Sequence, residues 1–147
     1  MFGVDIDWRE VVNNLTHLGV AYALALPVAW DREKATRSAG LRTFPLVAVA
    51  ACGYTLVGMS VLSSTEAESR VIQGILTGIG FIGGGAILKS NGTVRGTATA
   101  ASIWNTGLIG VAVAFSRYEI AILMSLINFL TLRFAARFKQ QPSDATD

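Results

Sequence analysis

Uncharged polar side chains inside long apolar stretches are the first candidates for chemistry in this chain. They are the amides and hydroxyls of Gln73, Thr77, Thr99, Ser102, Asn105 and Asn128. In apolar surroundings such groups turn inward and form hydrogen bonds between helices. The alternative is a polar path or ligand site lined by the same side chains. We favour interhelical hydrogen bonding, because ion paths usually include ionisable groups at depth.

Charged residues form a second candidate site, starting where the first apolar stretch ends. Asp31 and Glu33 carry carboxylate oxygens, which are the ligands that hydrated magnesium contacts. Arg32 lies between them, however, and ion pairing at a solvated helix end is the favoured interpretation. Arg42 and Arg95 are suited to contact lipid phosphates. We expect these five residues to form a charged rim, without a metal site or a cofactor.

Two other patterns are weaker signals. Residues 78–83 match the GxGxxG pattern, but no predicted strand precedes them, so close helix packing is favoured over nucleotide binding. The single histidine, His17, has no obvious partner for a metal, and we expect it to be hydrogen-bonded or interfacial. The sequence contains no recognisable nucleophile, base and acid arrangement. We therefore expect a protein that is not an enzyme.

Five apolar segments must position all of these residues. They cover residues 13–30, 44–62, 71–88, 98–115 and 119–136. A helix that spans a bilayer needs roughly 17–25 mostly apolar residues, because lipid offers no partners for backbone amides. With 52% hydrophobic and 15% charged residues among 147, the composition is too apolar for an ordinary soluble domain. The sequence predicts an all-α polytopic membrane protein with five transmembrane helices in a single domain, residues 1–139.

The two ends of the chain have different predicted structures. Apolar residues at helical spacing precede the first segment and predict a short amphipathic helix at the outer membrane surface. Residues 140–147 are polar and include a proline, which predicts a disordered cytoplasmic tail.

The distribution of basic residues predicts the orientation in the membrane. Nine Lys and Arg residues lie in the connections at 31–42 and 89–97 and at the C-terminal end from residue 133 onward, and three lie in the other connections. By the positive-inside rule, the N-terminus is outside and the C-terminus is cytoplasmic. The basic residues form no dense stripe, so no nucleic-acid partner is expected.

Glycines are concentrated in the third segment. Gly74 and Gly78 form one GxxxG pair, and Gly80 and Gly84 form another. Small residues allow the main chains of two helices to approach closely in lipid. The sequence therefore predicts that the third segment is the central packing helix and that these four glycines make its contacts.

The longest distinctive stretch runs from Gly74 to Gly110 and contains GIGFIGGGAIL, a basic loop and then VRGTATAASIW. This stretch resembles the MgtC/SapB family of bacterial inner-membrane proteins, and the resemblance extends over about residues 15–115. The family usually has a Glu-Arg-Glu run where this chain has Asp31, Arg32 and Glu33. Many members also carry a soluble C-terminal domain, whereas eight residues follow Lys139 here.

The resemblance implies a multi-pass protein of the bacterial inner (plasma) membrane, linked to growth under magnesium limitation. In the best-known branch it implies binding and restraint of the F-type ATP synthase. We therefore expect a non-enzymatic modulator in magnesium or ion homeostasis that contacts membrane lipids and other membrane proteins, and a homodimer is compatible with this role. The alternative is a small oligomeric ion transporter or channel. Its polar lining would be Gln73, Thr77, Ser102, Asn105 and Asn128.

Overall fold

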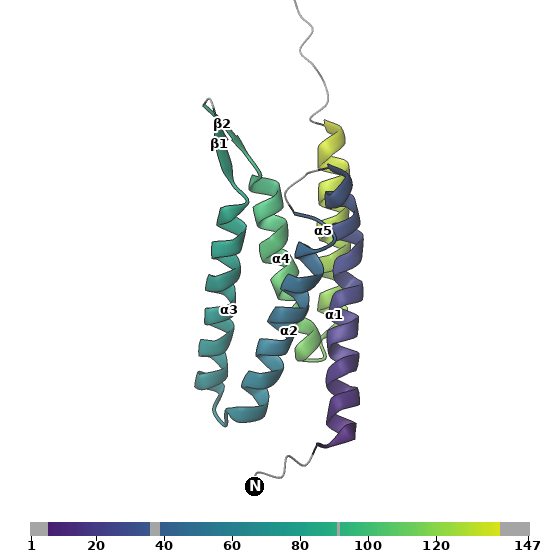
Figure 1. Cartoon of the computed structure of the whole chain (residues 1–147), viewed down its shortest axis with the longest axis vertical. Helices are drawn as coiled ribbons and strands as arrows, with labels where there is room; N and C mark the ends of the chain where they lie inside the picture. The colour runs from purple at the N-terminus through teal and green to yellow at the C-terminus, as the bar shows by residue number, and fades with distance from the viewer. Residues whose placement is uncertain (1–5, 36–38, 91, 139–147) are drawn as a thin grey trace, which may run out of the picture.

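A computed structural model describes residues 6–35, 39–90 and 92–138. The helices of this part of the chain are α1 (Trp8–Ala35), α2 (Thr43–Val61), α3 (Thr65–Gly85), α4 (Thr97–Ala114) and α5 (Tyr118–Phe138), and strands β1 (Leu88–Ser90) and β2 (Thr93–Arg95) lie between α3 and α4. The helices lie side by side along the long axis of the molecule, and successive helices run in opposite directions (Figure 1). The prediction of an all-helical architecture is confirmed, apart from the small hairpin.

Three helices have the length and composition needed to cross a membrane. Within the described residues these are α1, α2 and α4. The chain is therefore a membrane-type protein, and a count of five crossings stays a prediction. The predicted tail at residues 140–147 lies outside the described residues.

Several helices extend beyond the apolar segments predicted for them. Helix α3 begins at Thr65 because Ser64 caps it, with its side-chain oxygen accepting a hydrogen bond from the Ala67 amide at 3.2 Å. Helix α1 begins at Trp8 and continues to Ala35 without a break. The prediction of a separate amphipathic helix before the first span is therefore wrong. No glycine or proline interrupts residues 8–18, so the first turns simply extend α1.

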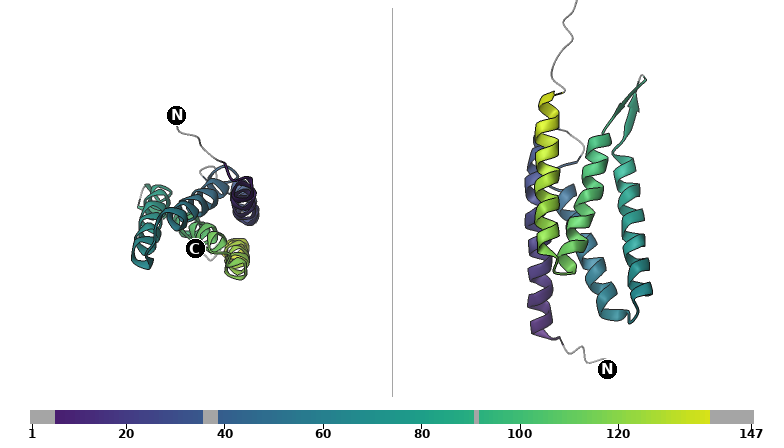
Figure 2. Two further views of the ribbon diagram at one scale, coloured as in Figure 1. Left: turned by 90° about the horizontal axis from the view of Figure 1, so that it is seen from below. Right: turned by 180° about the vertical axis from the view of Figure 1, so that it is seen from behind.

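Helix α4 is at the centre of the bundle. It packs against α1, α2, α3 and α5, and all of its residues from Ile109 to Ala114 are buried. Helix α3 packs mainly against α4 and α2, and the end-on view in Figure 2 shows it at one side of the bundle. The prediction that the third segment is the central packing helix is therefore wrong. A central helix needs small residues wherever neighbours approach, and α4 meets this need with Gly107 and Gly110.

A short antiparallel hairpin connects α3 to α4. Leu88 pairs with Arg95, and Lys89 pairs with Val94. The hairpin projects from the end of the bundle at which α5 also ends (Figure 1). Its position therefore places Lys89 and Arg95 beyond the ends of α3 and α4.

Candidate functional site

A buried polar cluster lies where α4 meets α5. Its buried members are Thr99, Ser102, Thr106, Ser125 and Asn128, and the half-buried Asn105 lies beside them. The side-chain amide of Asn128 donates a hydrogen bond to the Ser102 carbonyl at 3.3 Å, and that of Asn105 donates to the Met124 carbonyl at 3.3 Å. Both amides therefore join α4 to α5. They act as the interhelical hydrogen-bond donors that the sequence favoured.

Hydrogen bonding within this cluster is incomplete among the described residues. The Ser102 hydroxyl and the Asn105 side-chain oxygen are buried and have no partner in the described part of the chain. The Thr106 hydroxyl donates to the Ser102 carbonyl of its own helix at 2.8 Å. The members of the cluster carry only neutral amides and hydroxyls. They offer hydrogen bonds, but no general acid or base.

Ser125 makes a further interhelical bond. Its hydroxyl donates to the Leu24 carbonyl at 2.6 Å and so joins α5 to α1. The available signal was its position three residues before Asn128, which places both on the same face of the helix.

Ser125→Ala is expected to lower the free energy of unfolding by about 1 kcal/mol, because interhelical hydrogen bonds in membranes contribute roughly this much. The matched control is Ser69→Ala, whose hydroxyl is exposed and donates to the Thr65 carbonyl of its own helix. Titration with sodium dodecyl sulfate in mixed micelles measures the free energy of unfolding of both variants. Equal losses in the two variants would contradict the interhelical role of Ser125.

His17 joins α1 to the turn between α4 and α5. One ring nitrogen lies 2.8 Å from the Asn13 carbonyl oxygen, and the other lies 3.3 Å from the Ser116 hydroxyl. The hydrogen-bonded role predicted for this histidine is confirmed.

The four glycines predicted as packing residues face open space, not another helix, in the described part of the chain. A Cβ atom at Gly74, Gly78, Gly80 or Gly84 would have no neighbour within 4 Å among the described residues. Their predicted role in packing within the chain is therefore wrong. Gly83, which belongs to neither GxxxG pair, makes such a contact instead: a Cβ there would lie 3.1 Å from the Ala100 carbonyl oxygen of α4. The GxxxG spacing identifies a smooth face but not the direction in which that face points.

The two glycine pairs lie on different sides of α3. Residues two apart are separated by about 200° around a helix, so Gly78 and Gly80 point in nearly opposite directions. Gly74 and Gly78 line an open groove between α3 and α2. Gly80 and Gly84 share an exposed face with two polar residues. We call this set, Gln73, Thr77, Gly80 and Gly84, the outer face of α3.

The polar lining predicted for a transporter is not brought together in one chain. Gln73 and Thr77 lie on the outer face of α3 and are exposed. Ser102, Asn105 and Asn128 belong to the cluster between α4 and α5. Because α3 packs mainly on α2 and α4, the two groups lie on different surfaces of the bundle.

The charged rim is held together by contacts within the chain. The Asp31 carboxylate forms an ion pair with Arg32 at 2.8 Å, and both side chains are largely buried. The Glu33 carboxylate accepts a hydrogen bond from the Leu41 amide at 2.8 Å, and Gly40 packs directly against Glu33. Both carboxylates therefore have protein partners, and that of Glu33 fastens the connection between α1 and α2.

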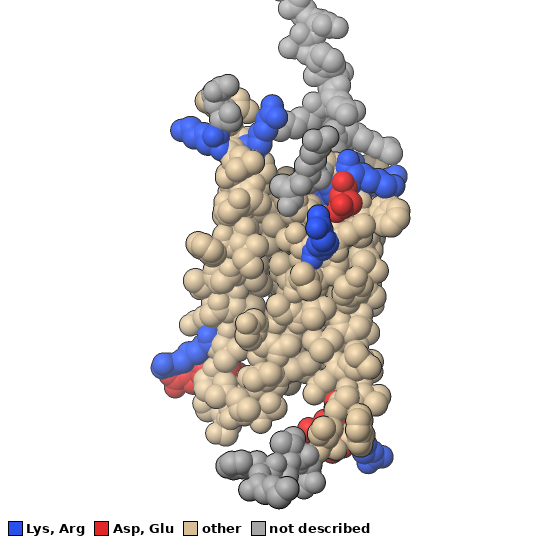
Figure 3. Space-filling view, viewed as in Figure 1, with Lys and Arg blue, Asp and Glu red and all other residues tan. Residues whose placement is uncertain are grey.

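The basic members of the rim, Arg42 and Arg95, are exposed. Figure 3 shows basic side chains gathered at the end of the molecule that carries the hairpin. Within residues 6–35, 39–90 and 92–138, no three His, Cys, Asp or Glu side chains come together as a metal site would require.

The family profile and the named relatives that match this chain indicate the same family. The MgtC family profile matches residues 18–141. An uncharacterized protein of Synechocystis is 35% identical over 97% of this chain, and proteins named MgtC from Brucella abortus and Salmonella typhimurium are each 33% identical over 95% and 89% of it. The chain spans 61%, 63% and 58% of the lengths of these curated relatives. No solved structure matches it at a significant level.

Proposed function

The chain belongs to the MgtC family, and from this membership we propose that it is a non-enzymatic modulator of magnesium or ion homeostasis. It acts by binding another membrane protein through the outer face of α3. The observation that carries this proposal is the exposure of Gln73, Thr77, Gly80 and Gly84 on one side of a helix at the edge of the bundle.

The outer face of α3 is poorly suited to contact lipid chains. A side-chain amide such as that of Gln73 has no partner in hydrocarbon, and burying it there is costly. A neighbouring helix removes this cost by supplying a hydrogen-bond partner, and the two glycines let its main chain approach closely. The face therefore favours a transmembrane helix of a partner over lipid. The F-type ATP synthase is the candidate partner that the family's best-known branch suggests.

The proposal includes a membrane crossing for all five helices. Helices α3 and α5 each have 21 residues, or about 31 Å at 1.5 Å per residue, and a bilayer core is about 30 Å thick. Both lie alongside the three helices that are apolar enough to span (Figures 1 and 2). Helix α1 begins at one end of the bundle and α5 ends at the other, as an odd number of crossings requires.

The distribution of charge supports the predicted orientation in a bacterial inner membrane. Lys89 and Arg95 lie in the hairpin, and Arg42 directly precedes α2, whose first residue lies toward the same end of the bundle (Figure 1). The positive-inside rule places this end, with the C-terminus, in the cytoplasm. The N-terminus is then outside.

The test uses Gly80→Leu and its matched control, Gly78→Leu, in a deletion strain grown at low magnesium. Both leucines point into open space in the monomer, but only Leu at position 80 obstructs the outer face of α3. Obstruction of a close helix contact costs about 1–3 kcal/mol, so we expect roughly tenfold less crosslinking to the ATP synthase and loss of growth rescue for Gly80→Leu alone. Equal rescue and crosslinking by both variants would contradict the proposal.

Flux measurements distinguish the alternative function. In liposomes, we expect the purified protein to produce no selective leak of magnesium or monovalent ions. A selective leak that is abolished by Asn105→Leu would favour the transporter over the modulator.

A further inference from the structure

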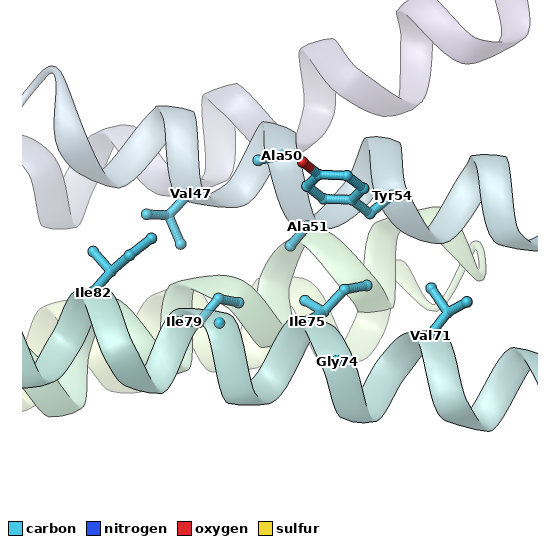
Figure 4. Close-up of a pocket in the computed structure, with 10 residues that line it drawn as sticks. Val47, Ala50, Ala51, Tyr54, Val71, Gly74, Ile75, Ile79 and Ile82 are labelled. Atoms are coloured by element: carbon cyan, nitrogen blue, oxygen red, sulfur yellow. The ribbon is translucent and has the colours of Figure 1, made fainter.

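An open groove of about 370 Å³ lies between helices α2 and α3. Figure 4 shows side chains of the two helices facing each other across it, with Val47 and Ala51 on α2 opposite Ile75 and Ile79 on α3. The groove exists because Gly74 and Gly78 have no side chains to fill it. Its lining is almost entirely aliphatic, with Tyr54 as the one residue carrying a side-chain polar group.

The groove is elongated along the bundle. On α3 it runs from Val71 to Ile82, which is about 16 Å at 1.5 Å per residue. This length is close to half of a bilayer core of roughly 30 Å, which is the depth of one leaflet. An unbranched hydrocarbon chain has this shape and this chemistry.

One end of the groove leads toward a cationic part of the molecule. Helix α3 ends at Gly85, three residues after Ile82, and the hairpin with Lys89 and Arg95 follows. Residues 69–118 include no aspartate or glutamate. The basic side chains over the hairpin in Figure 3 accordingly have no acidic side chain among them. An anionic group above the groove is therefore the complementary ligand.

The composition of the hairpin also favours contact with lipid headgroups. Leu88 and Val94 are 62% and 52% exposed, and they alternate with Lys89 and Arg95 along the two strands. An isolated two-stranded hairpin is marginally stable in water. A headgroup layer offers both apolar contact and negative charge, whereas bulk water offers only solvation.

We propose that the groove between α2 and α3 holds one acyl chain of an anionic phospholipid of the cytoplasmic leaflet, and that the positive charge of the hairpin, which carries Lys89 and Arg95 on its two faces, attracts the phosphate of that lipid. The inference rests on the proposed membrane orientation, but not on the proposed partner. The groove and the outer face of α3 lie on different sides of the helix, so the lipid and the partner helix bind without competition.

The test measures lipid retention by the full chain in nanodiscs of phosphatidylcholine containing a minor fraction of phosphatidylglycerol. Native mass spectrometry after mild detergent exchange counts the lipids that stay bound. We expect the wild type to retain phosphatidylglycerol in preference to phosphatidylcholine. Lys89→Gln and Arg95→Gln should each reduce this preference about fivefold, because each removes one cation near the headgroup.

Gly78→Leu fills the groove and is expected to lower retention of phosphatidylglycerol about tenfold. Gly80→Leu, two residues away on the outer face of α3, should retain it as the wild type does. If Gly78→Leu fails to fold by its circular dichroism melting curve, Ala50→Leu fills the groove from α2 instead.

Three results would overturn the inference: equal retention of the two lipids by the wild type, unchanged retention after the groove is filled, or conversion of a dimer to a monomer by Gly78→Leu. The last result would assign the groove to a second copy of the chain. Loss of partner crosslinking in Gly80→Leu, together with equal retention of the two lipids by the wild type, would mean that this inference alone fails. Preferential retention of phosphatidylglycerol with unchanged crosslinking in Gly80→Leu would mean that the proposed function alone fails.

Discussion

Gly110→Ala is expected to destabilise the bundle by about 3 kcal/mol, because the added methyl group has no space where α4 crosses α2. A Cβ at Gly110 would overlap the Ala48 carbonyl oxygen and lie 2.9 Å from the Cys52 amide nitrogen. These are backbone atoms, so they cannot move aside as a flexible side chain can. The whole of α2 would have to shift away from α4 to accommodate one methyl group.

The matched control is Gly74→Ala, which is also a glycine-to-alanine change inside a helix. A Cβ at Gly74 meets nothing within 4 Å among the described residues, so we expect a neutral effect or a gain of up to about 1 kcal/mol from helix propensity. Titration with sodium dodecyl sulfate in mixed micelles compares the two unfolding free energies. Similar values for the two variants would show that α2 and α4 do not approach as closely as the structure indicates.

Gly96→Ala is expected to destabilise the protein by about 3 kcal/mol and to displace the hairpin. Gly96 has a φ of 87°, in the left-handed region, where a non-glycine residue costs roughly 1–2 kcal/mol. A Cβ there would also overlap the Ala86 carbonyl oxygen. The residue stands directly before α4, and its carbonyl accepts the first helical hydrogen bond from Ala100 at 2.8 Å.

Gly92→Ala separates the two causes of this loss. Gly92 also has a positive φ, 78°, but a Cβ there meets nothing within 4 Å in the described part of the chain. We therefore expect a loss of about 1 kcal/mol from backbone conformation alone. Unfolding free energies measure the difference, and distances between spin labels on the hairpin and α4 report its displacement. Equal losses for Gly92→Ala and Gly96→Ala would rule out the clash with Ala86.

The two proposals assign different tasks to the exposed sides of α3. One side carries Gln73, Thr77, Gly80 and Gly84 and suits another helix, whereas the side with Gly74 and Gly78 is hollow and suits a hydrocarbon chain. A modulator that acts by direct contact needs a surface that packing within its own bundle leaves exposed. Helix α3 provides this surface because the central position belongs to α4.

The sequence alone determined the class of protein and the approximate position of every helix. Helix α2 covers Thr43–Val61 where 44–62 was predicted, and α4 covers Thr97–Ala114 where 98–115 was predicted. These predictions succeed because the requirement is local. A chain in lipid must satisfy its backbone within each segment, so each long apolar segment forms a helix. The family motif between Gly74 and Gly110 is local in the same sense, and the MgtC family profile matches it.

Only the tertiary structure decided which residues face one another. The sequence marked Gly74, Gly78, Gly80 and Gly84 as packing positions, but among the described residues other glycines, such as Gly83, Gly107 and Gly110, make close contacts with a neighbouring helix. Likewise, nothing in the spacing of Glu33 indicates that its carboxylate binds the Leu41 amide. The periodicity of a helix places residues on a common face, but the rotation of that helix about its axis is set by all of its neighbours together. The sequence of a single segment therefore does not determine this rotation, which depends on how the whole bundle packs.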